Sequence, residues 1–266
     1  MADEAGSKTY RFSVLKPGGE IGEQTTRPVV IEAPVAIEFN GIGYAVMMAT
    51  PINLDDFAVG FCLAENLVTR ADEIISIDIF QAAAGHILRI ALPQDRLEKV
   101  IARARQRVSE SSCGLCGMDN LDEVMRPLPL VTAKLMVADD AIFSALSGLR
   151  AHQPLNAATG AAHAAAFCAP DGSVQMIRED VGRHNALDKL IGALAKAQID
   201  PAAGFILLTA RCSFELVQKA VLANCSLLVT ISAATDLAIN TAAQYGLRLI
   251  SLARADTALD AAPQTG

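Results

Sequence analysis

The sequence contains no tryptophan, and aromatic residues make up only 5% of its 266 residues. Hydrophobic residues nevertheless account for 52% of the chain, so its core must be built mainly from Ala, Val, Ile and Leu. A long apolar run is also lacking. Although the mean hydropathy is +0.34, no stretch of about 18 residues is uncharged and apolar throughout, as a membrane-spanning helix requires. The length is sufficient for one large or two smaller globular domains.

Positive charge is scarce as well. The chain carries 22 basic and 29 acidic residues, for a net charge of −7, whereas general nucleic-acid binding needs a basic surface. The first residues, Met1–Ala5, lack the basic segment followed by an apolar one that begins a secretory signal. The sequence therefore predicts a cytoplasmic protein that binds neither nucleic acid nor membrane.

The six cysteines are expected to be reduced, because no secretory segment is present and a chain with this large a core does not need disulfides. Cys62, Cys168 and Cys225 lie in apolar stretches and are interpreted as small buried hydrophobic residues. Cys113 and Cys116 differ, because glycines flank them in a segment that reads as a loop. This pair is predicted to carry reactive sulfur, a bound metal or a disulfide.

The alternatives for the pair can be weighed by what each requires. A structural zinc site requires four ligands, and the Cys pair supplies two. His163 and His184, which could supply the others, are distant from the pair in sequence. A zinc deaminase needs an upstream His-x-Glu, which is absent. A thioredoxin-like pair begins a helix directly after a strand, whereas this pair follows a basic amphipathic helix expected over residues 93–107. A sulfur carrier fits better, since glycines allow close approach and nearby arginines would favour the attacking thiolate. Those arginines are equally consistent with a solvated helix face.

The order of elements predicts an α/β protein with two domains. Residues 1–27 are polar and expected to be frayed at their start. The N-terminal domain, residues 1–135, is expected to be a smaller α+β unit that includes the Cys-x-x-Cys loop at about 108–119. From 136 to 266, strands alternate with helices of about 10–15 residues, which indicates a three-layer α/β/α domain. The predicted strands are 28–39, 44–49, 74–80, 86–92, 163–168, 174–178, 205–208, 227–231 and 247–252, and the predicted helices are 53–63, 93–107, 138–150, 186–197, 214–222 and 237–245.

A second motif, Glu179–Gly192, places polar residues where a strand ends and a helix begins. Ligands bind at that edge of open α/β sheets, and helix N-termini favour anions. Asp180, Arg183 and His184 are therefore candidates for binding a phosphate-bearing ligand, although a simply capped helix is the alternative. Residues 209–215, with Arg211 and Ser213, form a similar turn, as do residues 232–236. His163, which precedes a strand, is equally compatible with a ligand contact and with a core histidine.

At these segments the chain resembles the formate dehydrogenase accessory sulfurtransferase family, FdhD, over roughly residues 30–252. The matching segments are Cys113–Gly117, Glu179–Gly192, Arg211–Lys219, Ser232–Thr235, Asn40–Gly41, Met48–Pro51 and Phe57–Phe61. The resemblance implies that a cysteine desulfurase loads a persulfide on Cys113, with Cys116 as its helper. The sulfur then passes to a molybdenum or tungsten cofactor that carries two pterin guanine dinucleotide groups, and the formate dehydrogenase catalytic subunit receives that cofactor.

The resemblance also implies a homodimer, no permanently bound metal, and a C-terminal domain resembling the cytidine-deaminase fold without its zinc chemistry. The cofactor-binding residues expected by position are His163, Asp180, Arg183, His184, Arg211, Ser213, Leu252, Ala253, Arg254, Ala255, Asp256 and Thr257. In this last stretch the family usually has Gly-Phe, a basic residue and then a Tyr, whereas here only the basic Arg254 matches. The alternative function is a cofactor-holding chaperone, or a zinc-stabilised binding protein, that transfers no sulfur.

Overall fold

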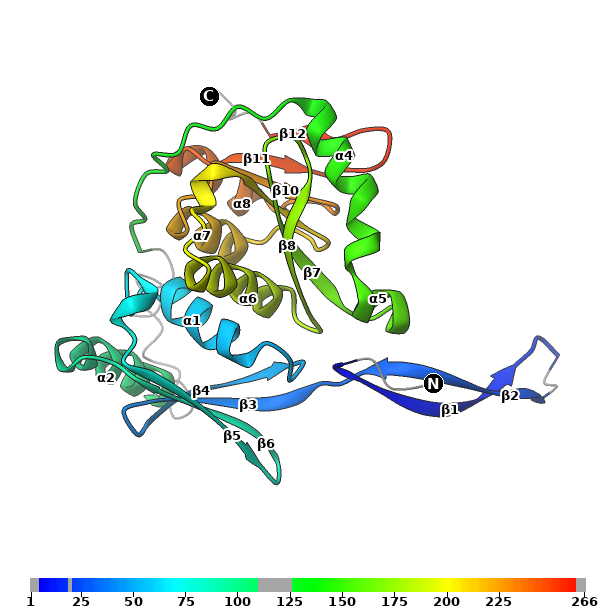
Figure 1. Cartoon of the computed structure of the whole chain (residues 1–266), viewed down its shortest axis with the longest axis horizontal. Helices are drawn as coiled ribbons and strands as arrows, with labels where there is room; N and C mark the ends of the chain where they lie inside the picture. The colour runs from blue at the N-terminus through cyan, green and yellow to red at the C-terminus, as the bar shows by residue number, and fades with distance from the viewer. Residues whose placement is uncertain (1–4, 19–20, 110–125, 262–266) are drawn as a thin grey trace.

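In the computed structural model, which describes residues 5–18, 21–109 and 126–261, the chain forms three β-sheets (Figure 1). The first is a two-stranded hairpin of β1 (Ser7–Leu15) and β2 (Ile21–Val30), which we call the arm. It lies mostly in the polar segment 1–27, where the sequence predicted no strand; the start of that segment, residues 1–4, lies outside the described residues. Tyr10, Phe12 and Val14 alternate with polar residues, which is the pattern of a strand with one apolar face.

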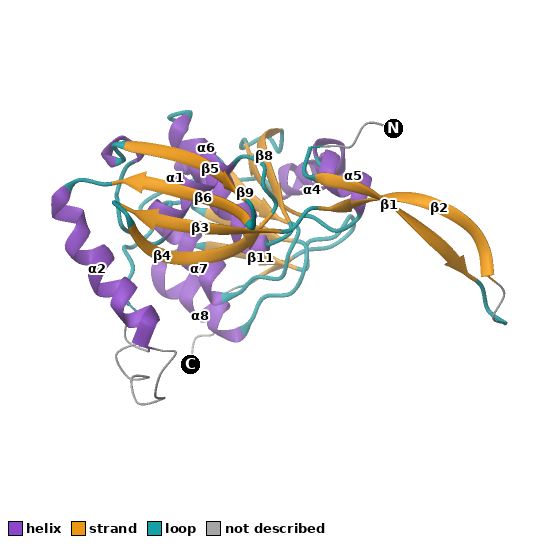
Figure 2. Cartoon of the chain, turned by 90° about the horizontal axis from the view of Figure 1, so that it is seen from below, coloured by secondary structure: helices purple, strands orange, loops and turns teal. Residues whose placement is uncertain are grey.

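The second sheet has four strands and forms the N-terminal unit. The strands are β3 (Ala33–Phe39), β4 (Ile42–Ala49), β5 (Ser76–Ala82) and β6 (Gly85–Ala91), in the order β4-β3-β6-β5. Asn40 and Gly41 have φ values of 48° and 83°, as the tight turn predicted between β3 and β4 requires. Helix α1 (Leu54–Ala64) packs on the inner face, and α2 (Gln94–Ser109) follows β6. A short 3₁₀ turn, η1 (Ala71–Glu73), precedes β5. No described helix crosses the outer face of this sheet in Figure 2.

The third sheet has six strands in the order β12-β11-β10-β9-β7-β8 and forms the C-terminal unit. Its strands are β7 (His163–Cys168), β8 (Val174–Asp180), β9 (Phe205–Leu208), β10 (Leu227–Thr230), β11 (Arg248–Ser251) and β12 (Leu259–Asp260). Helices α6 (Arg183–Lys196), α7 (Phe214–Leu222) and α8 (Asp236–Tyr245) cover one face, and α4 (Asp139–Leu149) covers the other. The short elements are η2 (Arg150–His152), α5 (Pro154–Thr159) and η3 (Pro201–Ala203).

The predicted mixed α/β architecture is therefore confirmed, and the described C-terminal unit has helix layers on both faces of its sheet. The further likeness to the cytidine-deaminase fold stays a prediction. Leu128 and Val131 already pack in the core of the C-terminal unit. The domain boundary predicted between residues 135 and 136 stays a prediction. None of the helices in the described ranges combines the length and the apolar character needed to span a bilayer.

Helix α1 lies between the four-stranded sheet and α6, and it joins the two units (Figure 1). Gly60 of α1 faces the backbone of α6, where a Cβ atom would lie 1.7 Å from the carbonyl oxygen of Asp188. Gly192 of α6 faces α1 in the same way, with 1.9 Å to the carbonyl oxygen of Asp56. Only glycine permits this approach. The two units therefore pack closely against each other along α1 and α6.

Candidate functional site

The polar residues predicted to bind a cofactor gather at one edge of the six-stranded sheet. Strands β9, β10 and β11 are parallel, so their carboxyl ends meet there. Strand β7 is antiparallel to β9 and to β8, which brings its first residue, His163, opposite Asp180 at the end of β8. We call this the polar edge. It comprises His163, the turn 180–184, the turn 209–213, Ser232 and the loop 252–257. Sequence reasoning placed these segments at strand ends, and the topology brings them together.

Two helices begin at the polar edge without a side-chain cap. Helix α6 starts after Gly182, and α7 starts after Ser213, whose hydroxyl makes no capping hydrogen bond. The Ser213 hydroxyl instead lies 3.2 Å from Nε2 of His184. Helix α8 differs, because Thr235 caps it by accepting a hydrogen bond from the amide of Ala238. Uncapped amides and the helix dipole attract anions, so α6 and α7 together favour a phosphate group at this edge.

Arg183 supplies a cation at the start of α6. Its Nε atom is buried and has no hydrogen-bond partner among the described residues, although buried polar groups normally have one. Burial lowers the pKa of His163, and the positive charge of Arg183 lowers it further. Arg211, from the neighbouring turn, is exposed. These side chains fit a polyanionic ligand, because a guanidinium can donate two parallel hydrogen bonds to a phosphate.

His184 is held neutral at physiological pH. Burial lowers its pKa to about 4, against the opposing effect of the Glu215 carboxylate, whose Oε2 lies 2.8 Å from the imidazole Nε2. A neutral imidazole can donate one hydrogen bond and accept another. His184 therefore offers the polar edge a hydrogen-bonding group that carries no charge at neutral pH.

Asp180 was predicted to bind the ligand, but in the structure its carboxylate is hydrogen-bonded to other groups of the protein. Its carboxylate is completely buried. It accepts hydrogen bonds from the amides of Thr50 (3.0 Å) and Gly182 (2.7 Å), from Nδ2 of Asn185 (3.0 Å) and from Nζ of Lys189 (2.6 Å). Asp180 thus fixes the turn that carries Arg183, and we interpret it as a positioning residue. A buried lysine at its side could not be inferred from the sequence, because lysine is almost never fully buried.

The loop that follows β11 closes the far side of the polar edge. The amides of Leu252 and Ala253 donate to the carbonyl oxygens of Ser232 and Thr230, at 3.2 and 3.1 Å. Ala253 is only 1% exposed, so its side chain packs inward instead of facing a ligand. The four residues after it are exposed along the rim: Arg254, Ala255, Asp256 and Thr257.

Cys113 and Cys116 lie outside the described residues, but the chain on both sides of them is anchored at one place. Lys99 and Arg103 of α2 donate hydrogen bonds to the carbonyl oxygens of Asn66 and Glu65, just past the end of α1. Arg126, which follows the undescribed segment, donates to the carbonyl oxygen of Ala64 at 3.2 Å. Cations stabilise the negative end of a helix dipole. Arg103 is consequently buried, so the solvated helix face, one of the two alternatives left open for the arginines of this helix, does not describe it.

The four described cysteines are all buried: Cys62, Cys168, Cys212 and Cys225. Burial raises the thiol pKa of Cys168 and of Cys212 to about 12, and that of Cys225 to about 11. Burial also raises the pKa of the Cys62 thiol. Because the thiolate is the nucleophile in sulfur exchange, none of these four is suited to the reaction at neutral pH. The three that the sequence predicted to be buried are confirmed as such.

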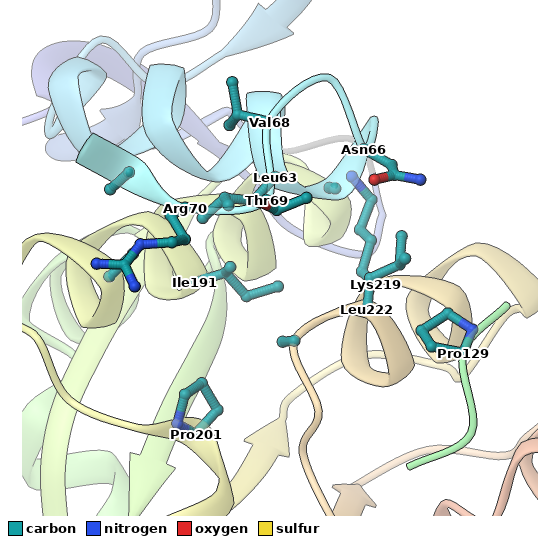
Figure 3. Close-up of a pocket in the computed structure, with 14 residues that line it drawn as sticks. Leu63, Asn66, Val68, Thr69, Arg70, Pro129, Ile191, Pro201, Lys219 and Leu222 are labelled. Carbon is teal, nitrogen blue, oxygen red and sulfur yellow. The ribbon is translucent and has the colours of Figure 1, made fainter. Parts of the chain in front are cut away.

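A cleft of about 480 Å³ opens where the two units meet, beside the anchored carbonyls (Figure 3). Most of its wall is apolar, with Leu63, Ile191 and Leu222 among the lining side chains. Lys219 also lines it, and its ammonium lies 2.6 and 2.7 Å from the two carboxylate oxygens of Asp188. Burial raises the pKa of Asp188 to about 6, although Lys219 opposes this shift. The sequence did not indicate this cleft, because its residues come from five separate segments.

Within the described ranges, no group of three or more His, Cys, Asp or Glu side chains could hold a metal ion. The Cys pair lies outside those ranges, so the zinc alternative for it stays a prediction.

The chain is similar to known proteins in sequence and in fold. The model of the FdhD/NarQ family matches residues 30–259. Proteins named sulfur carrier protein FdhD are similar to it: one from Xanthomonas euvesicatoria pv. vesicatoria is 47% identical over 85% of this chain and 80% of its own length. Another, from Bordetella petrii, is 41% identical over 93% and 90%. A crystal structure of a formate dehydrogenase accessory protein from Desulfotalea psychrophila has the same fold, with a TM-score of 0.75, 21% identity and 97% coverage of both chains. The chain therefore belongs to the FdhD/NarQ family.

Proposed function

We propose that this protein is a cytoplasmic sulfur carrier that takes sulfur from a cysteine desulfurase and passes it to the molybdenum (or tungsten) bis(pterin guanine dinucleotide) cofactor of formate dehydrogenase. The observation that carries the proposal is the polar edge. Two uncapped helix N-termini converge there with the buried Nε of Arg183, which has no hydrogen-bond partner in the described part of the chain, and the chain belongs to a family whose members include sulfur carriers. That combination suits a ligand rich in phosphate groups.

The sulfur step follows from thiolate chemistry. The Cys113 thiolate attacks the terminal sulfur of the donor's persulfide, a new S–S bond forms on Cys113, and the donor's own thiolate leaves. No net oxidation occurs in that exchange. For release, the Cys116 thiolate attacks the inner sulfur of the Cys113 persulfide and expels hydrosulfide. The sulfur is thereby reduced by two electrons, and the two cysteines are oxidised to a disulfide that a cellular thiol must reduce.

The cofactor is the substrate in this scheme, and the chain's own residues bind and orient it. Arg183 and the amides at the start of α6 and α7 would hold phosphate oxygens, with His184, Ser213 and Arg211 beside them. His163 and the rim residues 254–257 would contact the remainder of the nucleotide. The formate dehydrogenase catalytic subunit would receive the cofactor from this edge, and a homodimer would present two such edges.

The test is mass spectrometry after incubation with a cysteine desulfurase and cysteine. We expect a gain of one sulfur, about 32 Da, on the peptide containing Cys113 and Cys116. Cys113→Ala should gain none and should fail to activate formate dehydrogenase. Cys168→Ala, which removes a buried thiol, should load sulfur as the unaltered chain does. Stoichiometric zinc on the pair with no acquired sulfur would contradict the proposal and favour the zinc-stabilised alternative.

A cofactor-holding chaperone is the second candidate, and one observation favours it. The polar edge is built entirely from residues 163–257, without Cys113 and Cys116, so binding need not involve sulfur. The two functions separate in Cys113→Ala. A chaperone would keep its full ability to activate formate dehydrogenase, whereas a sulfur carrier would lose it while still binding the nucleotide.

Arg183→Met should weaken binding of guanosine diphosphate, used as a probe for the nucleotide end of the cofactor. Loss of a charge-assisted contact to phosphate predicts a fall in affinity of about 10- to 100-fold. Isothermal titration calorimetry measures it. Arg89→Met, on the exposed surface of the N-terminal sheet, is the matched control and should bind like the unaltered chain. Equal affinities for the two variants would show that Arg183 is not a phosphate ligand.

The imidazole of His184 should titrate near pH 4 in the free protein, because burial lowers its pKa to about 4. A phosphate beside it favours the imidazolium form, so guanosine diphosphate should raise that pKa and its binding should take up protons as the pH falls. Nuclear magnetic resonance of the imidazole follows both values, and His184→Gln assigns the signal. A titration at the ordinary histidine value that is indifferent to the nucleotide would contradict this.

A further inference from the structure

Thr50 follows β4 in the N-terminal unit, and all three of its polar groups contact the C-terminal unit. Its amide donates a hydrogen bond to Oδ2 of Asp180 at 3.0 Å, and its carbonyl oxygen accepts one from Nζ of Lys189 at 2.9 Å. Its hydroxyl oxygen accepts a third from the amide of Val181, at 3.1 Å. Thr50 is completely buried. It therefore joins the two units by directed hydrogen bonds as well as by packing.

The contact with Val181 is the one that depends on the identity of residue 50. The other two contacts are made by the backbone of Thr50, so most residues could make them. The third needs a side-chain oxygen, which threonine and serine have and valine lacks. Because Thr50 is completely buried, a valine there would leave the Val181 amide without its acceptor. A backbone amide that loses its partner away from water costs free energy, so the hydroxyl stabilises this one position of the Val181 peptide.

Val181 lies in the turn that connects Asp180, at the end of β8, to Arg183, at the start of α6. The carboxylate of Asp180 holds the middle of this turn by accepting a hydrogen bond from the amide of Gly182 at 2.7 Å. The hydroxyl of Thr50 holds the peptide just before it. Groups that bind a ligand must be kept within about 0.5 Å of their working position. Arg183 follows Val181 by two residues, so a shift of the Val181 peptide would move the guanidinium out of place.

We propose that Thr50 is a positioning residue of the polar edge. Its hydroxyl, through the amide of Val181, holds the turn 180–184 where Arg183 and His184 meet a phosphate group of the ligand. Thr50 does not contact the ligand itself, because it is completely buried. The inference rests on the proposed function, since it requires the polar edge to bind a nucleotide. It goes further by giving a residue of the N-terminal unit a part in the binding that the C-terminal unit performs.

The test measures the affinity of the full chain for guanosine diphosphate by isothermal titration calorimetry. Thr50→Val keeps the shape of the side chain but removes the acceptor, and we expect it to weaken binding about 10-fold. Thr50→Ser keeps the hydroxyl and should bind like the unaltered chain. Thr241→Val changes another buried threonine, in α8 and outside the polar edge, and should also leave the affinity unchanged. Circular dichroism checks that all three variants fold.

A double variant shows whether Thr50 acts through Arg183. If it does, Thr50→Val has nothing left to misplace once the guanidinium is gone, so Thr50→Val/Arg183→Met should bind guanosine diphosphate no more weakly than Arg183→Met alone. Losses that multiply in the double variant would overturn the proposal. Equal losses in Thr50→Val and Thr50→Ser would overturn it as well, because the hydroxyl would then not be the group that matters.

Amide hydrogen exchange, followed by nuclear magnetic resonance, reports on the turn without any ligand. In Thr50→Val the amides of Val181 and Gly182 should exchange about 10-fold faster or more, relative to those of β9, because the turn opens locally. Unchanged exchange together with unchanged nucleotide affinity in Thr50→Val would overturn this inference and leave the proposed function intact. An unaltered chain that binds no guanosine diphosphate would overturn both, so the two failures can be told apart.

Discussion

Gly60→Ala is expected to lower the free energy of unfolding by about 3 kcal/mol. The added methyl group would lie 1.7 Å from the carbonyl oxygen of Asp188, and because that atom is backbone, it cannot move aside as a flexible side chain would. Helices α1 and α6 must separate instead, which opens the seam between the two cores. Urea denaturation followed by circular dichroism measures the loss as a lower midpoint at an unchanged slope.

A matched control exists in α4. A Cβ atom at Gly148 would meet nothing within 4 Å, so Gly148→Ala should stabilise the protein by about 0.5–1 kcal/mol through helix propensity alone. Gly192→Ala should repeat the Gly60→Ala effect, since its methyl group would lie 1.9 Å from the carbonyl oxygen of Asp56. If Gly60→Ala instead behaved like Gly148→Ala, α1 and α6 could not be packed as closely as described. The same seam positions Arg183 and His184, so Gly60→Ala should also weaken nucleotide binding.

Helices and strands with a clear hydrophobic pattern could be predicted from the sequence. The gathering of the polar residues that follow the strands at the polar edge could be predicted as well. Apolar runs such as 205–208 and 227–231 became β9 and β10, and the Asn40-Gly41 turn joined two strands as expected. Polar residues at successive strand ends then had to share an edge, because parallel strands align their carboxyl ends. Local pattern and topology were sufficient for this part.

Features that depend on long-range packing could not be predicted in the same way. The arm was missed because its residues are mostly polar, and its apolar face stays exposed to solvent among the described residues. Neither Arg103 nor Asp180 was predicted to be buried, since charged residues are usually exposed. Both are buried because distant groups satisfy them: backbone carbonyls after α1 in one case, and Thr50 and Lys189 in the other. Sequence spacing carries no information on such partners.

Lys189→Met is expected to destabilise the protein by about 3–5 kcal/mol, because it leaves a buried carboxylate without its counter-charge. The ammonium of Lys189 and the carboxylate of Asp180 are 2.6 Å apart and both completely buried, and Lys189 also donates to the carbonyl oxygen of Thr50 at 2.9 Å. The pair therefore ties the N-terminal unit to the turn before α6. Thermal and urea denaturation measure the loss, and Arg70→Met, from an exposed ion pair with Asp72, should leave the unfolding midpoint unchanged.

Asp180→Asn distinguishes the electrostatic contribution from mere packing. Burial already lowers the pKa of Lys189, and Asp180 opposes that shift, so removing the carboxylate should lower the pKa of the ammonium further. The folded state then binds fewer protons than the unfolded state between the lowered pKa and the ordinary value of about 10.4. Stability of Asp180→Asn should consequently rise with pH through that window, whereas Lys189→Met should show no such rise.

The double variant Asp180→Asn/Lys189→Met removes both charges and should be more stable than Lys189→Met alone. If the double variant were instead as unstable as the sum of the two single ones, the two groups would not act as a pair, and the turn carrying Arg183 would have to be held in place by the Thr50 and Asn185 contacts alone.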